Sequence, residues 1–559
     1  MKSTKTLKIV IVGGVAGGMS AAARLRRQSE EAEIVVFERG EAVSFANCGL
    51  PYYIGDVIQD RAELLLQTPA SLKARFNIDV KIRHEVVSID RNRKSVSVRD
   101  LASGKVFEEH YDKLVLSPGA EALRPPIPGL NSSRVFTLRN MSDTDAIKKF
   151  VTERRLKNAV VIGAGFIGLE MAENLCHLGA RVSVIEALPQ VMNVVDPEIA
   201  ATVALHMREK GVELFLSQSV VSVRDNVDGL EITLSSGKTL QTEMAILSIG
   251  VKPESQLAKL AGLAIGDRGG ILVNEFLQTS DEHIYAAGDA VETKNMVTGK
   301  VGITPLAGPA NKQGRLIADN IAFGNVRKFR GTIGTGIAKV FDLSVGSTGA
   351  NEKTLGAAGI PFESVLIHPA SHAGYYPGAQ TITIKMLFSP VDGCILGAQA
   401  VGQEGVDRRL DVLALAVHKG LTVADLEEYE HVYAPPFSGA KDPVNLAAYV
   451  AINVLSGRLN TLTLVDFEKI DRNTVTVVDV RTRGEFEAGS ILGALNIPVD
   501  KLRERLSQIP TGKPVIVFCA VGLRAYVSAR ILMQSGFSNV RSLSGGYYSY
   551  AQIERMKIV

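Results

Sequence analysis

The stretch AVVIGAGFIGLEMAENLCHLGARVSVIE, residues 159–186, predicts a strand, a glycine-rich turn, a helix and a second strand. Gly163, Gly165 and Gly168 complete the pattern G-x-G-x-x-G directly after the first strand. The first glycine permits a tight turn, the second lets a pyrophosphate approach the backbone, and the third lets helix and strand pack closely. Glu186 ends the second strand, where a carboxylate can accept hydrogen bonds from both ribose hydroxyls and repel a 2′-phosphate. The stretch therefore predicts a dinucleotide site that favours NADH over NADPH.

A less complete version of this pattern opens the chain. KIVIVG (8–13) predicts a strand, an Ala- and Arg-rich stretch predicts a helix, and EIVVFE (33–38) predicts a second strand. The turn GGVAGG (13–18) places Val15 where the middle glycine should stand, whereas Glu38 again supplies the acid at the strand end. Two such openings predict two nucleotide-binding domains, each with a mainly parallel sheet.

Two further segments belong with the first turn. TSDEHIYAAGDA (279–290) predicts an apolar strand that ends in Gly288 and Asp289, a carboxylate beside flexible backbone that suits a ribityl chain near a diphosphate. LVLSPGA (114–120) predicts another strand end, which can form a second wall of the same site.

The composition limits the class of protein. At about 150 residues per domain, 559 residues predict three to four domains. The 62 basic and 59 acidic residues leave a net charge of +3, which argues against a nucleic-acid partner. No apolar run reaches the roughly 20 residues of a membrane span, and LKIVIV near the start is shorter than the core of a secretory signal. Four scattered cysteines form no disulfide framework, so we expect a cytoplasmic protein that uses its thiols singly.

The remaining chain predicts three other arrangements. HEVVSIDRNRKSVSVRD (84–100) predicts antiparallel strands with a turn at Asp-Arg-Asn. Residues 326–450 mix short β-rich stretches with a few helices and predict an α+β domain. From about residue 466, short apolar strands alternate with helical patterns and predict a small α/β domain.

The order GGVAGG, SFANCGLPYY, LVLSPGA, GAGFIGLE and YAAGDA resembles the flavoprotein disulfide reductases that carry two dinucleotide-binding domains. The resemblance covers roughly the first 450 residues. It implies an FAD-binding domain formed by residues 1–150 and 247–325, an NAD(P)H-binding domain at 151–246, and a dimerisation domain at 326–451 that makes a homodimer. Within that superfamily, the single cysteine of SFANCG is similar to that of the coenzyme A-disulfide reductases and their NADH oxidase and peroxidase relatives.

The resemblance also implies which residues contact the cofactors. For FAD and NADH, or possibly NADPH, they are Gly13, Gly14, Val15, Ala16, Gly17, Glu38, Arg39, Asn47, Val86, Ser117, Pro118, Gly119, Gly163, Gly165, Phe166, Ile167, Gly168, Glu186, Gly250, Gly288, Asp289, Pro305, Leu306 and Ala307.

Cys48 has no second cysteine nearby in sequence, unlike the C-x4-C pair of glutathione reductase-type enzymes. It must therefore use a mixed disulfide with a small thiol or a sulfenic acid. Its polar neighbours and the helix start at Pro51 predict a thiol pKa below the free value of about 8.5. The alternative is a buried structural cysteine, which is the role we expect for Cys176 and Cys394.

Coenzyme A is the small thiol that the resemblance implies. Arg24 and Arg27 stand three residues apart on the first helix, where the alternative is a solvated surface pair. A basic residue that the family uses further on falls at Phe76, and the adjacent Arg75 is its possible replacement. The implied coenzyme A contacts are Ser20, Arg24, Arg27, Ser44, Asn47, Arg75, Asn311 and Lys441.

Two later segments resemble the family segments whose tyrosines reach into the partner subunit's active site. HPASHAGYYPGA (368–379) maps Tyr375, or its neighbour Tyr376, onto one role, and HVYAPPFSGAKD (431–442) maps Tyr433 onto the other. A phenol beside Cys48 can stabilise the thiolate or protonate a leaving thiolate. The alternative role is interface packing. No metal site is expected, since His368 and His372 lack a third nearby ligand.

FCAVGLRA (518–525) places Cys519 at a strand end, before a turn that closes with Arg524. Backbone N–H groups of such a turn point at the sulfur and stabilise a thiolate or an anionic persulfide. With DVR (479–481), Glu485-Phe486 and GALNIP, this segment resembles a rhodanese domain at residues 466–559, in which Ser490 stands where many rhodaneses have His. The alternative is an idle rhodanese that serves for docking.

The predicted fold class is thus α/β, with two Rossmann-like domains, an α+β dimerisation domain and a C-terminal α/β rhodanese domain. The joint hypothesis is a flavoenzyme that passes electrons from NADH through FAD to a sulfur–sulfur bond at Cys48, while Cys519 carries sulfane sulfur. Its substrate would be coenzyme A disulfide, coenzyme A persulfide or polysulfide. The alternatives are an NADH oxidase or peroxidase that cycles Cys48 through sulfenic acid, and a sulfur relay that docks through the rhodanese domain.

Overall fold

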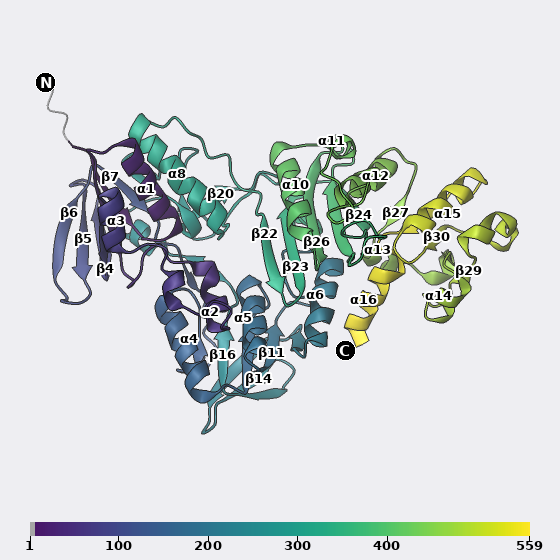
Figure 1. Ribbon diagram of the computed structural model, residues 1–559, viewed down its shortest axis with the longest axis horizontal. Helices are drawn as coiled ribbons and strands as arrows, with labels where there is room; N and C mark the ends of the chain where they lie inside the picture. Colours follow the sequence, from purple (N-terminus) through teal and green to yellow (C-terminus); the bar gives the residue numbers. More distant parts are fainter. Residues whose placement is uncertain (1–5, 559) are drawn as a thin grey trace. The chain divides into compact units, whose positions relative to one another are not determined.

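A computed structural model describes residues 6–558 (Figure 1). The chain forms two compact units. The first contains the chain up to Pro189 together with Gly211–Gly334, and the second contains Gln190–Lys210 together with the chain from Thr335 onward.

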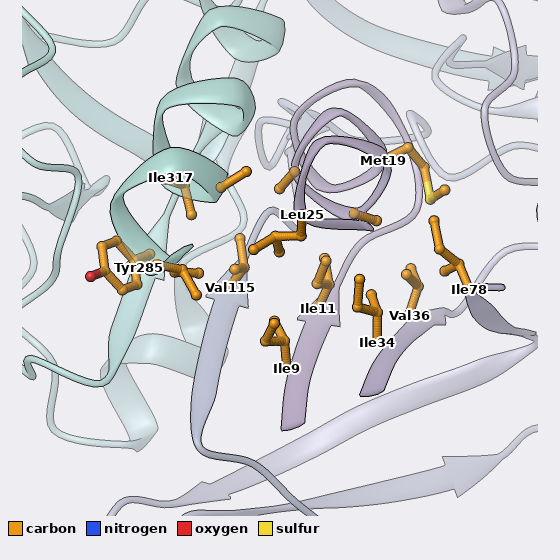
Figure 2. Close-up of a cluster of buried hydrophobic side chains, with 14 of the residues drawn as sticks. Ile9, Ile11, Met19, Leu25, Ile34, Val36, Ile78, Val115, Tyr285 and Ile317 are labelled. Carbon is orange, nitrogen blue, oxygen red and sulfur yellow. The ribbon is translucent and has the colours of Figure 1, made fainter. Parts of the chain in front are cut away.

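The first unit is built on a parallel sheet with the strand order β19-β7-β1-β2-β3. Its strands are β1 (Lys8–Val12), β2 (Glu33–Glu38), β3 (Asp79–Ile82), β7 (Lys113–Leu116) and β19 (Ile284–Ala286). Helices α1 (Ala16–Gln28) and α8 (Ala307–Phe323) cover one face, where the inward side chains of β1 and β2 meet Leu25 and Ile317 (Figure 2). Because β19 pairs with β7, the sheet joins segments about 170 residues apart in the chain.

Both faces of this sheet are buried, which explains the continuous apolar run KIVIV. Alternate residues of β1 point to the opposite face and pack against Val96 and Val98. Those two residues lie in the predicted antiparallel meander of β4 (His84–Asp90), β5 (Ser95–Asp100) and β6 (Val106–His110).

A second parallel sheet repeats the plan, in the order β12-β11-β10-β16-β9. Its strands are β9 (Val135–Phe136), β10 (Asn158–Ile162), β11 (Arg181–Glu186), β12 (Glu213–Leu216) and β16 (Met244–Leu247), and α5 (Phe166–His177) follows β10. The two Rossmann-like sheets predicted from the sequence are therefore confirmed. Strand β9 pairs with β16 although the expected boundary at residue 150 assigns it to the first domain.

Shorter elements complete the first unit. They are η1 (Asn47–Gly49), α2 (Leu50–Ile54), η2 (Arg61–Leu64), α3 (Pro69–Phe76), β8 (Ala120–Ala122), α4 (Met141–Arg154), β13 (Val220–Asp225), β14 (Leu230–Leu234), β15 (Thr239–Thr242), β17 (Val251–Pro253), α7 (Gln256–Leu260), β18 (Ile271–Leu272), η3 (Gly288–Ala290), β20 (Val291–Lys294) and β21 (Val301–Gly302).

The second unit begins with an antiparallel sheet in the order β22-β23-β26-β25-β24, as the α+β pattern predicts. Its elements are β22 (Gly336–Val340), β23 (Leu343–Gly349), α9 (Glu352–Ala358), β24 (Glu363–Ile367), β25 (Ile382–Phe388), β26 (Ile395–Gly402), α10 (Val406–Lys419), α11 (Val423–Glu428) and α12 (Pro443–Leu455). Helix α6 (Pro197–Glu209) follows β11 in sequence but packs in this unit, against β26 and α16 (Gly546–Ile558).

The last part of the second unit is a parallel sheet in the order β27-β31-β30-β28-β29. Its elements are β27 (Thr461–Leu462), α13 (Leu464–Lys469), η4 (Arg472–Thr474), β28 (Thr476–Asp479), α14 (Arg483–Glu487), β29 (Leu495–Asn496), η5 (Val499–Glu504), η6 (Leu506–Gln508), β30 (Val515–Phe518), α15 (Leu523–Gln534), β31 (Val540–Leu543) and α16. The predicted C-terminal α/β domain is confirmed.

Helix α6 is held by a buried group of charges. The Lys385 Nζ atom on β25 lies 3.3 Å from Asp196, 2.9 Å from Glu198 and 2.9 Å from Glu352. The side chains of Lys385, Asp196 and Glu198 are 2–3% exposed. Gln399 completes the group, since its amide exchanges hydrogen bonds with the backbone and carboxylate of Asp196. One ammonium thus contacts three carboxylates and ties α6 to the antiparallel sheet.

We predict that Lys385→Met destabilises the second unit, because it leaves the buried carboxylates without their counter-charge. A loss of about 3 kcal/mol is expected, which lowers the melting temperature by roughly 6–12 °C for a unit of this size. The control is Lys353→Met, since that exposed lysine makes only a 3.3 Å contact with the Asn193 side chain. Equal melting temperatures of the two variants would contradict the assignment.

Candidate functional site

The first glycine-rich turn is shaped by backbone contacts. Gly13 has φ +100°, and a Cβ atom there would lie 2.0 Å from the carbonyl oxygen of Ser117. A Cβ on Gly18 would lie 1.9 Å from the oxygen of Gly13. Gly18 is therefore the third glycine of the pattern, and the candidates named from the sequence omit it. The Glu38 carboxylate accepts hydrogen bonds from the N–H groups of Gly14 at 2.8 Å and Gly40 at 2.7 Å.

The second turn repeats this construction. Gly163 has φ +103° and its Cβ would meet the Ser248 oxygen at 2.6 Å, while a Cβ on Gly168 would meet the Gly163 oxygen at 2.0 Å. Gly165 faces open space at the start of α5, which is where a pyrophosphate needs access to the backbone. The Glu186 carboxylate accepts from the N–H groups of Ala164 at 2.8 Å and Leu188 at 2.9 Å.

The predicted walls of the first site converge. Ser117 lies at the end of β7, and its hydroxyl would be 2.6 Å from a Cβ on Gly17 and 3.5 Å from one on Gly288. The N–H of Gly288 donates to Gln313 Oε1 at 2.7 Å. The Asp289 carboxylate lies 3.4 Å from Arg139, and burial raises the pKa of Asp289. Neither Gln313 nor Arg139 is among the sequence candidates, and only the folded chain places them here.

Other cofactor candidates have mixed positions. Pro305, Leu306 and Ala307 stand at the start of α8. Val86 is buried in the core, so a contact there would involve its backbone. Arg39 is half exposed and pairs with Glu254. Ser44 and Gly250 lie in loops, the latter with φ +118°, and Asn47 begins η1.

Cys48 is an exposed thiol on η1, directly before α2. Partial burial of its sulfur, and then the carboxylates of Glu170 and Asp289, raise the pKa of the thiol. The predicted lowering of this pKa is therefore wrong for the protein residues alone, since the nearest charges are negative. Cys176 and Cys394 are half-buried rather than fully in the core.

Glu170 and Tyr52 form a proton-holding pair near Cys48. The Tyr52 hydroxyl donates to Glu170 Oε1 at 3.5 Å, from α2 to α5. Burial, opposed by the hydrogen bond from Tyr52 and assisted by the charge of Glu173, raises the pKa of Glu170 to about 7. Burial and the charge of Glu170 also raise the pKa of Tyr52. Neither residue is among the candidates predicted from the sequence, although Glu170 lies two residues after Gly168 on the nucleotide-binding helix.

The coenzyme A candidates of the first unit lie on α1, α3 and α8 and in the segment before α2. Ser20 donates a hydrogen bond to Asn311, which joins α1 to α8. Arg24 lies on the same helix and pairs with Asp319 at 2.7 Å. Arg27 and Arg75 are exposed, and Ser44 and Asn47 share the loop that leads to Cys48. Lys441 is exposed in the second unit.

The two tyrosines mapped from the sequence lie together. Tyr375 and Tyr433 hydroxyls are 3.0 Å apart, although 58 residues separate them in sequence. Both side chains are exposed, at 76% and 48%. Tyr376 instead packs edge-on against His372. Tyr375 is thus the member of the pair that contacts Tyr433.

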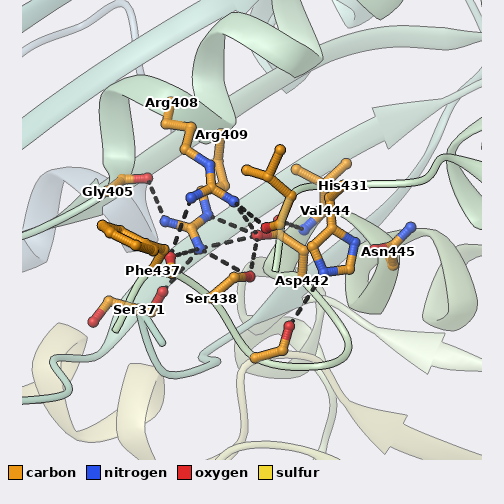
Figure 3. A network of polar contacts seen from close by, with 12 residues as sticks. Ser371, Gly405, Arg408, Arg409, His431, Phe437, Ser438, Asp442, Val444 and Asn445 are labelled. Atoms are coloured by element: carbon orange, nitrogen blue, oxygen red, sulfur yellow. Dashed lines mark hydrogen bonds and ion pairs between the residues drawn. The ribbon is translucent and has the colours of Figure 1, made fainter. Parts of the chain in front are cut away.

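A buried arginine holds the two tyrosine loops in place (Figure 3). Arg409 of α10 donates to the Ser371 carbonyl at 2.8 Å and to the Asp442 carboxylate at 2.9 Å. Asp442 also accepts from Ser438 at 2.7 Å. Burial opposes ionisation of Asp442, but these hydrogen bonds, that of the Val444 N–H and the charge of Arg409 lower its pKa. The sequence analysis did not identify this support.

Cys519 directly follows β30 in the second unit. Its side chain is buried, and the Gly522 N–H donates to the sulfur at 3.1 Å. Arg524 forms a two-pronged ion pair with Glu485, with both N–O distances 2.7 Å. This pair lowers the pKa of Glu485 to about 2. Ser490 donates to the buried Asp479 at 2.7 Å, so it keeps a polar contact at the position where many rhodaneses have His.

Comparison with known proteins gives the family. A family model described as pyridine nucleotide-disulphide oxidoreductase matches residues 7–314. The dimerisation-domain model of the same family matches 336–443, and a rhodanese-like domain model matches 467–553. The chain belongs to the pyridine nucleotide-disulphide oxidoreductase family.

Several relatives within this family are similar along most of the chain. The coenzyme A disulfide reductase of Staphylococcus epidermidis is 37% identical over 79% of this chain and 99% of its own. The crystal structure of reduced Bacillus anthracis CoADR-RHD is 48% identical, with a TM-score of 0.96 over 98% of both chains. A NAD-dependent persulfide reductase from A. fulgidus is 39% identical, with a TM-score of 0.91 over 97% of this chain and 100% of that one.

The family binds FAD and NAD(P)H, and both turns fit a dinucleotide. Each has a glycine that no side chain could replace, a helix start, and a strand-end glutamate held by backbone N–H groups. Within residues 6–558, no group of three or more His, Cys, Asp or Glu side chains is arranged to hold a metal ion. None of the helices in that range combines the length and apolar character needed to cross a membrane.

We predict that Glu170→Gln makes Cys48 more reactive above neutral pH. The ionised Glu170 carboxylate opposes the thiolate, so its removal lowers the pKa of the Cys48 thiol. Since the pKa of Glu170 is about 7, the effect should be absent at pH 6 and reach roughly two- to tenfold at pH 8. Iodoacetamide labelling of Cys48 in the reduced protein, followed by peptide mass spectrometry, measures it. Glu153→Gln on α4 is the control, and a ratio independent of pH would contradict the prediction.

We also predict that Glu186→Ser shifts cofactor preference toward NADPH. The substitution removes the acceptor for the ribose hydroxyls and the charge that repels a 2′-phosphate. The ratio of kcat/KM for NADH to that for NADPH should fall by roughly tenfold or more, which is about 1.4 kcal/mol or more. Glu38→Ser, the same change at the first turn, should weaken flavin retention and leave this ratio unaltered. An unchanged ratio in Glu186→Ser would refute the role of Glu186.

Proposed function

We propose that this protein is an NADH-dependent flavoprotein that reduces coenzyme A disulfide, coenzyme A persulfide or polysulfide at Cys48. Its rhodanese domain carries sulfane sulfur at Cys519. The observation that carries the proposal is the presence of two cysteine sites, each with its own local support, on one family member. The names of the relatives from Staphylococcus epidermidis, Bacillus anthracis and A. fulgidus agree with it.

The isolation of Cys48 determines the kind of substrate. All four cysteines are free thiols, and no other cysteine lies on η1 or α2. An internal disulfide of the kind used by two-cysteine reductases is therefore absent from this part of the chain. Cys48 must instead form its oxidised state with a sulfur from outside, or as a sulfenic acid.

The chemistry at Cys48 balances with NADH as the reductant. The Cys48 thiolate attacks the inner sulfur of coenzyme A persulfide, the sulfur–sulfur bond breaks, and HS⁻ leaves. The product is a mixed disulfide between Cys48 and coenzyme A, which takes up two electrons and releases both thiolates. FAD, when bound, carries the two electrons of the NADH hydride to this disulfide. Overall, NADH, a proton and the persulfide give NAD⁺, coenzyme A and hydrogen sulfide.

Glu170 and Tyr52 hold and donate protons at this site in the proposed reaction. A carboxyl group with a pKa of about 7 holds its proton for part of the time at neutral pH. Such a group can donate a proton to a departing thiolate and recover one from Tyr52 or water. The pair joins α2, which follows the Cys48 loop, to α5 of the nucleotide-binding domain.

Coenzyme A recognition is assigned to residues around these elements. Ser20, Arg24, Arg27, Asn311, Ser44 and Asn47 offer cations and hydrogen-bond donors, with Arg75 and Lys441 as further cations. Tyr375 and Tyr433 act at the active site of the partner in a homodimer, which the match to a dimerisation-domain model supports. The proposed functional domains remain 1–150 with 247–325, 151–246, 326–451 and 466–559, although β9 pairs in the second sheet and α6 packs in the second unit. The single-use thiols favour a cytoplasmic location.

Cys519 is proposed to carry sulfur without a change in total oxidation state. A coenzyme A thiolate attacks the outer sulfur of a Cys519 persulfide, which releases the Cys519 thiolate and forms the persulfide that Cys48 reduces. The Gly522 N–H, 3.1 Å from the Cys519 sulfur, would stabilise the thiolate that this transfer releases.

An oxidase or peroxidase is the second candidate. The water-forming NADH oxidase from Lactobacillus brevis is 28% identical over 81% of this chain, with a TM-score of 0.78. In that case Cys48 would cycle through sulfenic acid. Turnover with oxygen or peroxide that far exceeds turnover with sulfur substrates would select this function.

We predict that Cys48→Ser abolishes NADH oxidation driven by coenzyme A persulfide or coenzyme A disulfide. The serine hydroxyl cannot form the mixed disulfide, so the rate should fall at least about a hundredfold, equivalent to about 2.7 kcal/mol. Stopped-flow absorbance of the NADH-reduced enzyme measures reoxidation. Cys176→Ser, on α5, should keep the wild-type rate, and Cys519→Ser should keep disulfide reduction. Persulfide-dependent reoxidation that survives in Cys48→Ser would sink the proposal.

A further inference from the structure

His368 is a buried histidine of the interface domain that the proposed reaction at Cys48 does not use. It follows β24 and begins the segment that leads to Tyr375. Its Nδ1 atom lies 2.9 Å from the hydroxyl of Thr383 on β25. Burial lowers the pKa of His368 to about 4, so the imidazole is neutral in the physiological range.

The other side of the His368 ring faces the rhodanese domain. Its Nε2 atom lies 3.2 Å from the Gly545 carbonyl oxygen and 3.0 Å from the Ser549 hydroxyl. The ring packs edge-on against Tyr548, with a centroid distance of 4.7 Å. Since the carbonyl can only accept, Nε2 carries the proton and donates it, while Nδ1 accepts from Thr383. The contacts therefore determine the tautomer of the ring.

Gly545 lies in a turn that packs against β24 of the interface sheet. Gly545 and Gly546 have φ +77° and +60°, immediately before and at the start of α16. A Cβ atom on Gly545 would lie 2.6 Å from the Leu366 side chain of β24. Because these two glycines have no side chains, the backbone approaches β24 closely enough for His368 to donate a hydrogen bond to the Gly545 carbonyl.

The same turn supports the loop of Cys519. The Tyr547 N–H donates to the carbonyl of Cys519 at 2.8 Å, and the Tyr548 N–H donates to that of Ala520 at 3.0 Å. These two carbonyls belong to the peptides directly before the one whose N–H, that of Gly522, donates to the Cys519 sulfur at 3.1 Å. A chain of contacts therefore runs from Thr383 through His368 and the first turn of α16 to the cradle of Cys519.

From this chain of contacts we propose that His368 is a positioning residue for sulfur transfer at Cys519. It fixes the first turn of α16 against the interface sheet, and that turn sets the peptide carbonyls of the sulfur-carrying loop. The interface domain is thus part of the support of the sulfurtransferase site. The inference rests on the proposed sulfur-carrier role of Cys519.

The test uses the full-length flavoprotein with thiosulfate and cyanide. Thiosulfate transfers its outer sulfur to Cys519 with release of sulfite, and cyanide removes that sulfur as thiocyanate, which is measured by its iron complex. His368→Ala should lower kcat/KM for thiosulfate by about ten- to a hundredfold, as expected for a small displacement of a reacting group. His368→Gln should recover at least half of the lost activity on a logarithmic scale, because its amide N–H can reach the Gly545 carbonyl.

Two controls separate positioning from general damage. Reduction of coenzyme A disulfide by NADH, flavin content and melting temperature should stay within twofold or a few degrees of wild type in both variants. His372→Ala removes a buried histidine of the same segment, whose Nδ1 atom contacts only its own neighbour Ala373 at 3.2 Å, and should leave thiocyanate formation unchanged.

Two results would overturn the inference alone: wild-type thiocyanate formation in His368→Ala, or a parallel loss of disulfide reduction in both His368 variants. Thiocyanate formation that persists in Cys519→Ser would overturn the sulfur-carrier role of Cys519, and the inference with it.

Discussion

The close approach of backbone to backbone at the two glycine-rich turns is the constraint on which the first unit depends. At Gly13 and Gly163 a side chain would overlap the carbonyl of the next strand, at 2.0 Å from Ser117 and 2.6 Å from Ser248. Only a turn without a side chain lets the helix start directly above the edge of the sheet. In that arrangement the backbone N–H groups of each turn face one site in each domain. At the edge of that site, the glutamate at the strand end accepts a hydrogen bond from the N–H group of Gly14 or Ala164. The Cys48 loop leads into α2, which packs against α5, the helix that follows the second turn.

The negative charges around Cys48 affect the reactivity of its thiol. Glu170 and Asp289 disfavour the thiolate, and burial acts in the same direction. A thiol held in its neutral form is protected from adventitious oxidation, because the thiolate is the reactive species. The charge on Glu170 also depends on pH near neutrality, so the protonation of this carboxyl and the reactivity of Cys48 are linked through one electrostatic contact.

Much of this architecture could be predicted from local sequence. The turn 163–168, the strand ends at Glu38 and Glu186, and the loop of Cys519 each depend on residues close together in the chain, so their patterns are visible. Gln313, Arg139 and Arg409 could not be found this way, because their partners lie 25 to 150 residues away and depend on strand order. The packing of α6 in the second unit could not be predicted from the sequence either, because α6 follows β11 as the crossover helix of a parallel sheet would. The direction of the Cys48 pKa shift could not be predicted, because burial of the sulfur and the charge of Glu170 from another domain's helix both depend on the folded chain.

The interface sheet does more than provide a surface for a second subunit. Buried polar side chains on or beside it reach in three directions: Lys385 to helix α6, Arg409 to the tyrosine loops, and His368 to the turn before α16. A buried charge or imidazole tolerates little displacement, because every lost hydrogen bond leaves an unpaired polar group in a dry environment. Such contacts restrict the displacement of two elements more than apolar packing does, because apolar side chains can shift and repack. Arg409 holds the carbonyl of Ser371, three residues after His368, whereas His368 contacts the carbonyl of Gly545, so the tyrosine pair and the Cys519 loop have distinct polar supports. The interface sheet thereby provides separate polar supports for the tyrosine pair and for the turn before α16.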